Sequence, residues 1–195
     1  MNIVFDLGGV VVAWRPEAIA AGVFPDAATQ ALVRREVFGH PDWLELDRGV
    51  LERADAIARA AARTGLAAAE VDRLFRAVPP SLTPIPGSVE LMRRLKGEGH
   101  SLYCLSNMHP ASIAHLEAAC DFWDVFSGLA ISCRLRLCKP EPAIFQHLLD
   151  RHSLQARDTV FIDDTAMNLA AAARFGIQTI QFESPRQCEE RLQAL

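Results

Sequence analysis

The chain has 195 residues, of which 50% are hydrophobic and 23% are charged, and its formal net charge is −4. Such a length and composition are typical of one globular domain, or of one domain with a modest insertion, and they exclude a disordered chain. A mildly acidic chain without a basic block also lacks the positive surface to which nucleic acids bind.

The start of the chain and its cysteines bear on where the protein resides. Residues 1–5 carry no positively charged region and Asp6 follows at once, so we expect no secretory signal. No apolar stretch approaches the roughly 20 residues that a membrane span needs. The five cysteines are odd in number and none forms a C-x-x-C pair. We therefore expect reduced thiols in a cytoplasmic protein, and no zinc site.

Apolar, β-favouring segments alternate with helical patterns over most of the chain. Strands are predicted at residues 2–5, 101–105, 159–162 and 178–182, with a weaker candidate at 130–132. Helices are predicted at residues 88–96, 142–151 and 168–175, where glycine or proline marks one end. This alternation predicts an α/β domain with a parallel sheet.

One region, residues 17–78, breaks the alternation because it contains no strand pattern. Apolar residues recur there at three- and four-residue spacing, which predicts helices at residues 27–38, 51–63 and 68–77. Pro79-Pro80 and Pro84-Ile85-Pro86-Gly87 then mark the return to the α/β pattern. We interpret the region as a helical insert on two linkers, with a hinge at the proline-rich return.

Candidate functional residues stand where predicted strands end. Asp6 follows the first strand, Ser106-Asn107 follow a second and Asp163-Asp164 a third, while Lys139 precedes the helix that begins near Pro142. In parallel α/β sheets, ligands bind outside the carboxyl ends of the strands. We therefore expect three carboxylates, one hydroxyl and one ammonium to share a single crevice.

This set of groups suits phosphoryl chemistry with a hard divalent cation. Mg²⁺ prefers a few carboxylates together with water and phosphate oxygens. A lysine and a hydroxyl suit a phosphate group, and Lys139 would also hold Asp6 ionised. An aspartate can itself attack phosphorus and form an acyl phosphate.

Four short motifs, in this order, resemble those of the haloacid dehalogenase superfamily. They are Phe5-Asp6-Leu7-Gly8-Gly9-Val10, Leu105-Ser106-Asn107, Lys139-Pro140-Glu141-Pro142 and Phe161-Ile162-Asp163-Asp164-Thr165. The resemblance runs from Ile3 to about Phe182, and the first motif most resembles a phosphatase branch that includes an α-D-glucose-1-phosphate phosphatase. It implies a Rossmann-like α/β core of residues 1–14 and 84–195, with a small inserted helical cap of residues 15–83.

The resemblance implies a Mg²⁺ site and assigns its ligands. Asp6 and the backbone carbonyl of Gly8 would ligate the ion. Asp164 would ligate it directly, and Asp163 would ligate it or hold a water of its shell. Which of the two adjacent aspartates is the direct ligand stays open.

The resemblance also implies how phosphoryl transfer is catalysed. Asp6 would attack phosphorus. Ser106 would hydrogen-bond a phosphoryl oxygen with the help of Asn107. Lys139 would balance the charge of the pentacoordinate state.

Gly8 departs from the superfamily pattern in one respect. Most phosphatases of the superfamily carry an aspartate there, which protonates the leaving group and later activates water. General acid–base help of this kind is typically worth ~10²–10⁴-fold in rate. His109, close after the second motif, and Asp47, in the predicted cap, are candidate replacements. The branch named above also lacks this aspartate, which argues against an inactive protein.

Ordinary structural roles compete with functional ones for the remaining candidates. His109 is also a typical loop histidine, and Asp47 a typical surface charge. Asn168 lies one helical turn past the aspartate pair, so it either faces the metal site or has a capping or solvent-facing role. Trp14 and Trp43 are both more typical of core or cap packing than of substrate binding, and Trp43, near Asp47 in the sequence, is the better candidate to line the pocket.

The sequence therefore predicts a Mg²⁺-dependent phosphomonoesterase of a small, sugar-type phosphate, acting through a phospho-Asp6 intermediate. A metal-independent 2-haloacid dehalogenase is one alternative, since halide leaves without a proton. The aspartate pair argues against it, because those enzymes generally lack a paired acid there, and so does Gly8, where they usually carry an aromatic residue. A non-catalytic module that binds a phosphorylated metabolite or a protein is a second alternative, supported by Gly8 alone. The oligomeric state stays open.

Overall fold

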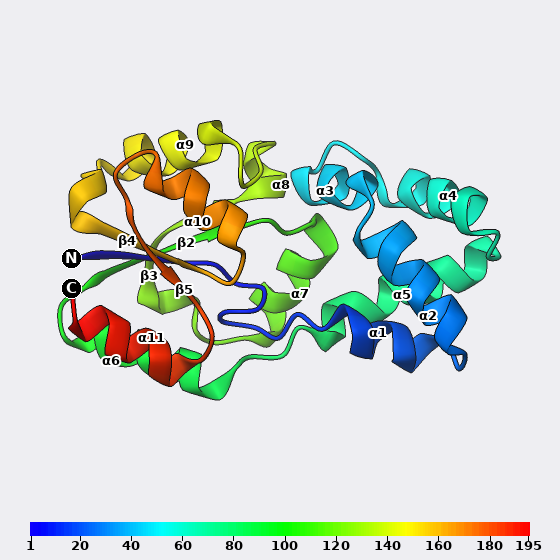
Figure 1. Ribbon diagram of the computed structural model, residues 1–195, viewed down its shortest axis with the longest axis horizontal. Helices are drawn as coiled ribbons and strands as arrows, with labels where there is room; N and C mark the ends of the chain where they lie inside the picture. Colours follow the sequence, from blue (N-terminus) through cyan, green and yellow to red (C-terminus); the bar gives the residue numbers. More distant parts are fainter.

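The computed structural model describes residues 1–195 and has a five-stranded parallel sheet at its centre (Figure 1). The strands lie in the order β3-β2-β1-β4-β5. Their bounds are β1 Asn2–Phe5, β2 Ser101–Ser106, β3 Phe126–Ile131, β4 Thr159–Asp163 and β5 Gln178–Gln181. The predicted α/β fold with a parallel, Rossmann-like sheet is confirmed.

Helices cover both faces of the sheet, and successive residues of the central strand point to opposite faces. Ile3 and Phe5 pack with α6, α7 and α11, whereas Val4 packs with α9 and α10. The bounds are α6 Pro86–Gly97, α7 Pro110–Ala119, α9 Pro142–His152, α10 Ala166–Ala173 and α11 Pro185–Gln193, with short turns η2 Trp123–Val125 and η3 Ala156–Asp158. Burial on both faces explains why the inner strands are continuous apolar runs. None of the helices combines the length and the apolar character that crossing a bilayer requires.

The register of the inner strands brings their carboxyl ends level. Phe5 is paired with Cys104 of β2 and with Ile162 of β4. The backbone N–H of Asp6 then donates to the carbonyl of Ile162 at 2.9 Å. Asp6 therefore emerges beside the end of β4, where Asp163 lies.

The edge strand β3 is longer than predicted. The weak pattern at residues 130–132 covers only its end, because the strand runs from Phe126 to Ile131 and Ser132 already begins α8 (Ser132–Leu135). An edge strand faces solvent in part, so its outer residues need not be apolar. Gly128 lies against the ring of His152, where any larger side chain would collide. Because of these two features, the first half of the strand does not form an apolar run in the sequence.

Between β1 and α6 the chain forms only helices, α1 to α5, which we call the helical insert (Figure 1). Its helices are α1 Pro16–Val23, α2 Ala27–Val33, the π-helical turn η1 Arg34–Phe38, α3 Pro41–Arg48, α4 Arg53–Thr64 and α5 Ala68–Ser81. They bury a cluster of 14 hydrophobic residues of their own, distinct from the two clusters that flank the sheet. The division into a core of residues 1–14 and 84–195 and a cap of residues 15–83 stays a prediction.

Two linkers join the helical insert to the sheet, and they run side by side. The backbone N–H of Ala13 donates to the carbonyl of Thr83, and that of Ile85 donates to the carbonyl of Val11, both at 2.8 Å. The two linkers are therefore hydrogen-bonded to each other over a short antiparallel stretch.

The return linker begins later than predicted, because α5 continues through Pro79 and Pro80 to Ser81. Proline lacks the N–H that a helix interior needs, so a proline pair is expected to end a helix. Here the pair lies in the last turn, where few hydrogen bonds are lost. The Ser81 hydroxyl also donates to the carbonyl of Val78 at 2.6 Å, which supplies a donor for this turn.

Candidate active site

Asp6 lies directly after β1, at the carboxyl edge of the sheet, and is only 8% exposed. Its Oδ1 accepts a hydrogen bond from the backbone N–H of Leu7 at 2.7 Å, and its Oδ2 lies 2.9 Å from Lys139 Nζ. Burial raises the pKa of Asp6 to about 7, and the Lys139 ammonium opposes this rise. The carboxylate is thus fixed in place and faces a positive charge.

Lys139 is buried and joins two carboxylates. Its Nζ lies 2.7 Å from Asp163 Oδ2 in addition to its contact with Asp6. Burial disfavours the ammonium, yet the two carboxylates together raise the pKa of Lys139 above its usual value. The lysine therefore stays charged inside the protein.

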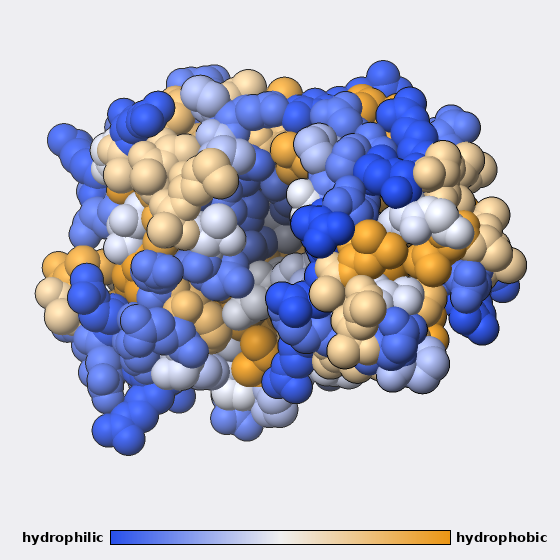
Figure 2. Space-filling view, turned by 45° about the vertical axis from the view of Figure 1, so that its right-hand side comes forward, coloured by the Kyte–Doolittle hydropathy of each residue, from blue (hydrophilic) through white to orange (hydrophobic).

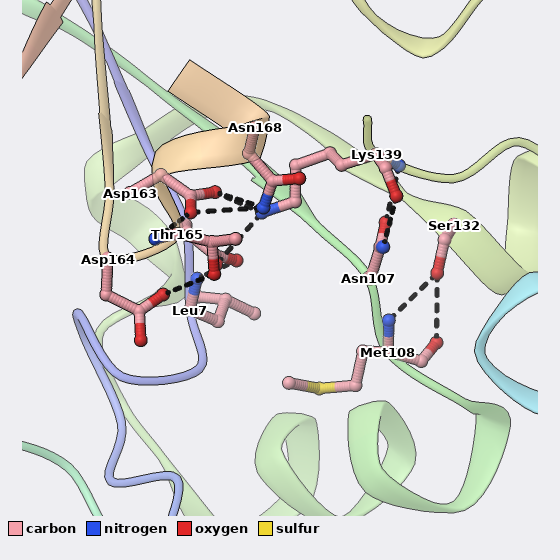
Figure 3. Close-up of polar contacts among 10 residues, drawn as sticks. Leu7, Asn107, Met108, Ser132, Lys139, Asp163, Asp164, Thr165 and Asn168 are labelled. Atoms are coloured by element: carbon pink, nitrogen blue, oxygen red, sulfur yellow. Dashed lines mark hydrogen bonds and ion pairs between the residues drawn. The ribbon is translucent and has the colours of Figure 1, made fainter. Parts of the chain in front are cut away.

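Asn107 positions this lysine rather than facing the carboxylates. Its Nδ2 donates to the backbone carbonyl of Lys139 at 2.9 Å, and its Oδ1 accepts from the backbone N–H of Lys139 at 2.8 Å (Figure 3). Both ends of the amide are used in this pair of bonds. The structure thus gives Asn107 a supporting contact that sequence reasoning did not identify.

The two adjacent aspartates have different surroundings. Asp163 is fully buried, and besides the ammonium it accepts from the backbone N–H of Thr165 at 2.8 Å and from Asn168 Nδ2 at 3.1 Å (Figure 3). Asp164 is exposed, lines the cavity described below and accepts from the Thr165 hydroxyl at 3.2 Å. One oxygen each of Asp6, Asp163 and Asp164 lie within 4.8 Å of one another. The greater exposure of Asp164 makes it the more accessible ligand for a metal ion. The side chain of Asn168 is hydrogen-bonded to Asp163 instead.

Ser106 ends β2 and carries a buried hydroxyl without a partner. The residue is 1% exposed, and its Oγ makes no hydrogen bond of good geometry within the protein, although it lies close enough to Asp6 to help lower the pKa of that carboxyl. Buried polar atoms are normally paired, so an orphaned hydroxyl needs an explanation. An anionic oxygen held between Ser106 and Lys139 would provide the missing partner.

Gly9 is a site residue that sequence reasoning missed. Its φ is +77°, in the left-handed region that favours glycine, and a Cβ there would collide with the Asp164 carboxylate. The turn after Asp6 therefore lets the backbone approach Asp164 closely. The double glycine in the sequence was the available signal.

Asp6 and Asp164 line the floor of a cavity of about 230 Å³ between the sheet edge and the helical insert. Figure 2 shows the surface hollowed between these two parts of the molecule. Gly8 lines this cavity, and its apolar lining consists of Trp14, Phe38, Trp43, Val78, Leu82 and Met108. Trp43 lines the cavity, and Trp14 stacks on it with ring centroids 5.9 Å apart. Trp14 packs against the hydrophobic clusters, as expected, and it also lines the cavity.

Asp47 of α3 lines the same cavity and is only 9% exposed. The ordinary expectation of a surface charge is therefore wrong for this residue. Burial raises the pKa of Asp47 to about 8; a hydrogen bond from the His109 backbone opposes the rise and the charge of Asp6 adds to it. Asp47 is thus an acidic side chain that favours its protonated form inside the cavity.

His109 is the N-cap of α7 rather than a free loop residue. Its Nδ1 accepts from the backbone N–H of Ser112 at 3.4 Å, and its Nε2 lies 2.9 Å from the Ser112 hydroxyl. Burial lowers the pKa of His109 to about 4. The ring lines the cavity as a neutral imidazole and packs edge-on against Trp43.

Two polar contacts fix α3 against the core. The Ser132 hydroxyl donates to the backbone carbonyl of Asp47 at 2.5 Å and accepts from the backbone N–H of Met108 at 2.8 Å; Figure 3 shows the contact with Met108. Arg48 pairs with Glu141 through both guanidinium ends, at 2.8 and 2.5 Å. These contacts join residues far apart in the chain, so no local pattern pointed to them.

Comparison with known proteins places the chain among hydrolases. The family model described as haloacid dehalogenase-like hydrolase matches residues 1–176. A sesquiterpene phosphatase of Aspergillus oryzae is 28% identical over 89% of this chain and 85% of its own length. Acyl-CoA dehydrogenase family member 10 of Mus musculus is 27% identical over 99% of the chain, which spans only 19% of that longer protein.

Solved structures share the fold at lower sequence identity. A HAD family enzyme from Bacteroides thetaiotaomicron, in complex with magnesium and inorganic phosphate, has a TM-score of 0.70 at 20% identity, with 93% of each chain covered. An L-2-haloacid dehalogenase from Xanthobacter autotrophicus has a TM-score of 0.68 at 17% identity, covering 99% of this chain and 82% of the other. At these identities the likeness shows the fold alone.

Proposed function

The chain belongs to the haloacid dehalogenase-like hydrolase family, and on that premise we propose that it is a Mg²⁺-dependent phosphomonoesterase that works through a phospho-Asp6 intermediate. The observation that carries the proposal is the cluster of Asp6, Asp163 and Asp164 oxygens, within 4.8 Å of one another, beside the ammonium of Lys139. Carboxylates in such a group suit a hard cation. The unpaired Ser106 hydroxyl beside them suits a phosphoryl oxygen.

The donor set of the site fits Mg²⁺. Asp6 and Asp164 would hold the ion together with the backbone carbonyl of Gly8. Asp163 would stabilise the position of Lys139, with which it forms an ion pair. When bound, Mg²⁺ supplies a Lewis acid that neutralises charge on the phosphoryl group. A HAD family enzyme of the same fold has been solved with magnesium and inorganic phosphate, which supports a Mg²⁺ site but not the choice of ligands.

Four residues of the chain would take part in phosphoryl transfer, each with a different role. Asp6 attacks phosphorus, which forms the Asp6–phosphorus bond and breaks the bond to the leaving oxygen. Lys139 and Ser106 hold the phosphoryl oxygens as negative charge develops on them. Asn107 keeps Lys139 in position through its two bonds to the lysine backbone.

The substrate that we propose is a small phosphorylated metabolite in the cytoplasm, a location that the five free thiols favour. A sugar-type leaving group stays a prediction from the sequence. The cavity lining that the insert and its linkers provide, with Trp14, Phe38 and Trp43, favours a leaving group that is apolar at least in part. The sesquiterpene phosphatase relative supports the same preference.

A 2-haloacid dehalogenase would use the same Asp6 to attack carbon, and it remains the main alternative chemistry. It has no need of the three clustered carboxylates. A non-catalytic module would bind phosphate without turnover. The fixed position of Asp6 against Lys139 favours an enzyme over such a module.

The test is hydrolysis of p-nitrophenyl phosphate, glucose 1-phosphate and farnesyl monophosphate, with Mg²⁺ and with EDTA. We expect turnover that requires the metal and that falls by at least ~10⁴-fold in Asp6→Asn, because the nucleophile is lost. Asp158→Asn is the matched control. Asp158 is exposed and lies just before the first residue of β4, at the edge of the sheet opposite the site.

Both variants should keep the circular dichroism spectrum and a cooperative unfolding transition. Turnover by a contamination-free Asp6→Asn protein would contradict the mechanism. Release of halide from a 2-haloacid in the presence of EDTA would favour the dehalogenase instead. Phosphate binding without any turnover would favour the binding module.

A further inference from the structure

The proposed reaction needs a proton donor for the leaving oxygen, and the turn after Asp6 does not provide one. Gly8 carries no acid, although its Cβ position has ordinary room, with Trp14 Cβ at 3.8 Å as the nearest atom. An unactivated alcohol departs slowly as an alkoxide, so a phosphomonoesterase without an acid is confined to good leaving groups. A proton donor for such a leaving group must therefore come from elsewhere in the cavity lining.

The geometry of displacement indicates where this donor must stand. Asp6 approaches phosphorus from the floor of the cavity, and Lys139 and Ser106 lie beside it in the core. In an in-line displacement the leaving oxygen lies opposite the nucleophile. It therefore points away from the sheet, toward the helical insert.

Asp47 is the one ionisable side chain that the helical insert contributes to the cavity lining; the insert and its linkers otherwise supply Trp14, Phe38, Trp43, Val78 and Leu82. The residue is buried, and its backbone is tied to the core through the Ser132 hydroxyl at 2.5 Å. A catalytic acid must be held in this way, because a mobile carboxyl would seldom meet the leaving oxygen.

His109 is less suited to this task, although it lines the same cavity. Both of its ring nitrogens are engaged with Ser112, where the ring caps α7. Burial lowers the pKa of His109 to about 4, so the imidazole carries no surplus proton near neutral pH. Its contribution is the wall of the cavity beside Trp43.

We propose that Asp47 is the general acid of the reaction, supplied by the helical insert in place of the residue that Gly8 lacks. This inference rests on the proposed phosphatase function. As the Asp6–phosphorus bond forms and the bond to the leaving oxygen breaks, the Asp47 carboxyl gives its proton to that oxygen, which departs as an alcohol. Water then attacks phospho-Asp6 and gives its proton to the Asp47 carboxylate. Inorganic phosphate leaves, and both side chains return to their starting forms.

The surroundings of Asp47 support this role. Burial raises the pKa of Asp47 to about 8, so the group holds its proton at neutral pH, as a general acid must. The ionisable groups near Asp47 are Asp6, Lys139, His109, Cys133 and Cys138. Among them Asp6 favours the protonated form, whereas the Lys139 ammonium and the His109 backbone amide disfavour it.

The test compares Asp47→Asn with the wild type on two substrates, p-nitrophenyl phosphate and 2-phenylethyl phosphate. Both are aromatic, but only the alkyl ester needs a proton for its leaving group. We expect kcat/KM for 2-phenylethyl phosphate to fall by ~10²–10⁴-fold and that for p-nitrophenyl phosphate by about tenfold or less. The constant kcat/KM is chosen because it reports the transfer to Asp6 and not the later hydrolysis.

Glu45→Gln is the control, because Glu45 lies on the same helix with its side chain 44% exposed. It should leave both values unchanged. In the wild type, kcat/KM for the alkyl ester should fall as the pH rises above about 8, and Asp47→Asn should lack this limb.

Equal losses on the two substrates, or no loss on the alkyl ester, would overturn the role of Asp47 while leaving the phosphatase function intact. A wild type without activity on either ester would overturn the phosphatase function itself, and this inference with it. Asparagine has the shape of the protonated carboxyl, so the variant should fold. Thermal unfolding checks this and identifies any loss of activity that comes from misfolding.

Discussion

At the residue scale, the turn after the nucleophile depends on Gly9. The backbone has φ +77° there, and the Asp164 carboxylate occupies the space of a Cβ. In Gly9→Ala we expect a conformational cost of about 1–2 kcal/mol and displacement of Asp164 from the carboxylate group. Mg²⁺ affinity, measured by isothermal titration, should therefore fall by about 10–100-fold.

Gly22→Ala is the matched control for this change. Gly22 lies in α1 and has no atom near its Cβ position, so alanine there should leave Mg²⁺ affinity unchanged. An unchanged Mg²⁺ affinity in Gly9→Ala would mean that Asp164 is not a ligand.

Most candidate residues that the sequence placed together stand at the carboxyl ends of strands, and Lys139, which precedes a helix, joins them. Asp6 and Asp163 could be placed together because parallel strands of one sheet end at one edge. Asp47 and Trp14 could not, because their burial depends on how the helical insert lies over the core. A helical aspartate in a polar stretch has the pattern of a surface residue, and only tertiary packing shows otherwise.

At the element scale, the contact of α3 with the core rests on the Ser132 hydroxyl. It donates to the Asp47 carbonyl and accepts from the Met108 N–H. Ser132→Ala leaves both backbone groups without this partner, at a cost of roughly 1–3 kcal/mol in the free energy of unfolding. Because the bond also fixes the helix that carries Asp47, we expect kcat/KM for an alkyl phosphate to fall as well.

Urea denaturation and steady-state kinetics would measure the two effects of Ser132→Ala. Ser127→Ala is the control, since Ser127 is an exposed serine of the neighbouring β3. A loss of stability without any loss of kcat/KM would show that the bond serves folding alone.

Elements with a strong local pattern were predictable, and elements defined by their surroundings were not. The inner strands are apolar without interruption because they are buried on both faces. The helices α1, α3, α7 and α11 were not singled out, although a proline stands at the first position of each. Each has 8 to 10 residues, so it offers few turns over which an apolar period can be recognised.

At the scale of the whole molecule, the cavity lowers the stability of the folded protein at alkaline pH, because it keeps the carboxyl of Asp47 away from water. The folded-state pKa of Asp47 is about 8, well above the ordinary value of 3.8. The folded protein therefore binds this proton more tightly than the unfolded chain does. Its contribution to stability is fully present below about pH 4 and is lost as the pH rises toward about 8.

Asp47→Asn removes this titration, because asparagine stays neutral at every pH. We expect the stability of the variant relative to the wild type to increase between pH 5 and pH 9 by a few kcal/mol, on the order that a pKa shift of this kind implies. Urea denaturation at both pH values, in EDTA so that no metal contributes, would measure the difference.

Glu45→Gln provides the reference, since it removes a half-exposed carboxylate from the same helix. A constant stability difference between Asp47→Asn and the wild type across this range would show that Asp47 is not held protonated by the fold. A rising difference, together with slower cleavage of alkyl esters by the variant, would mean that the fold gives up stability at alkaline pH to keep an acid in the cavity.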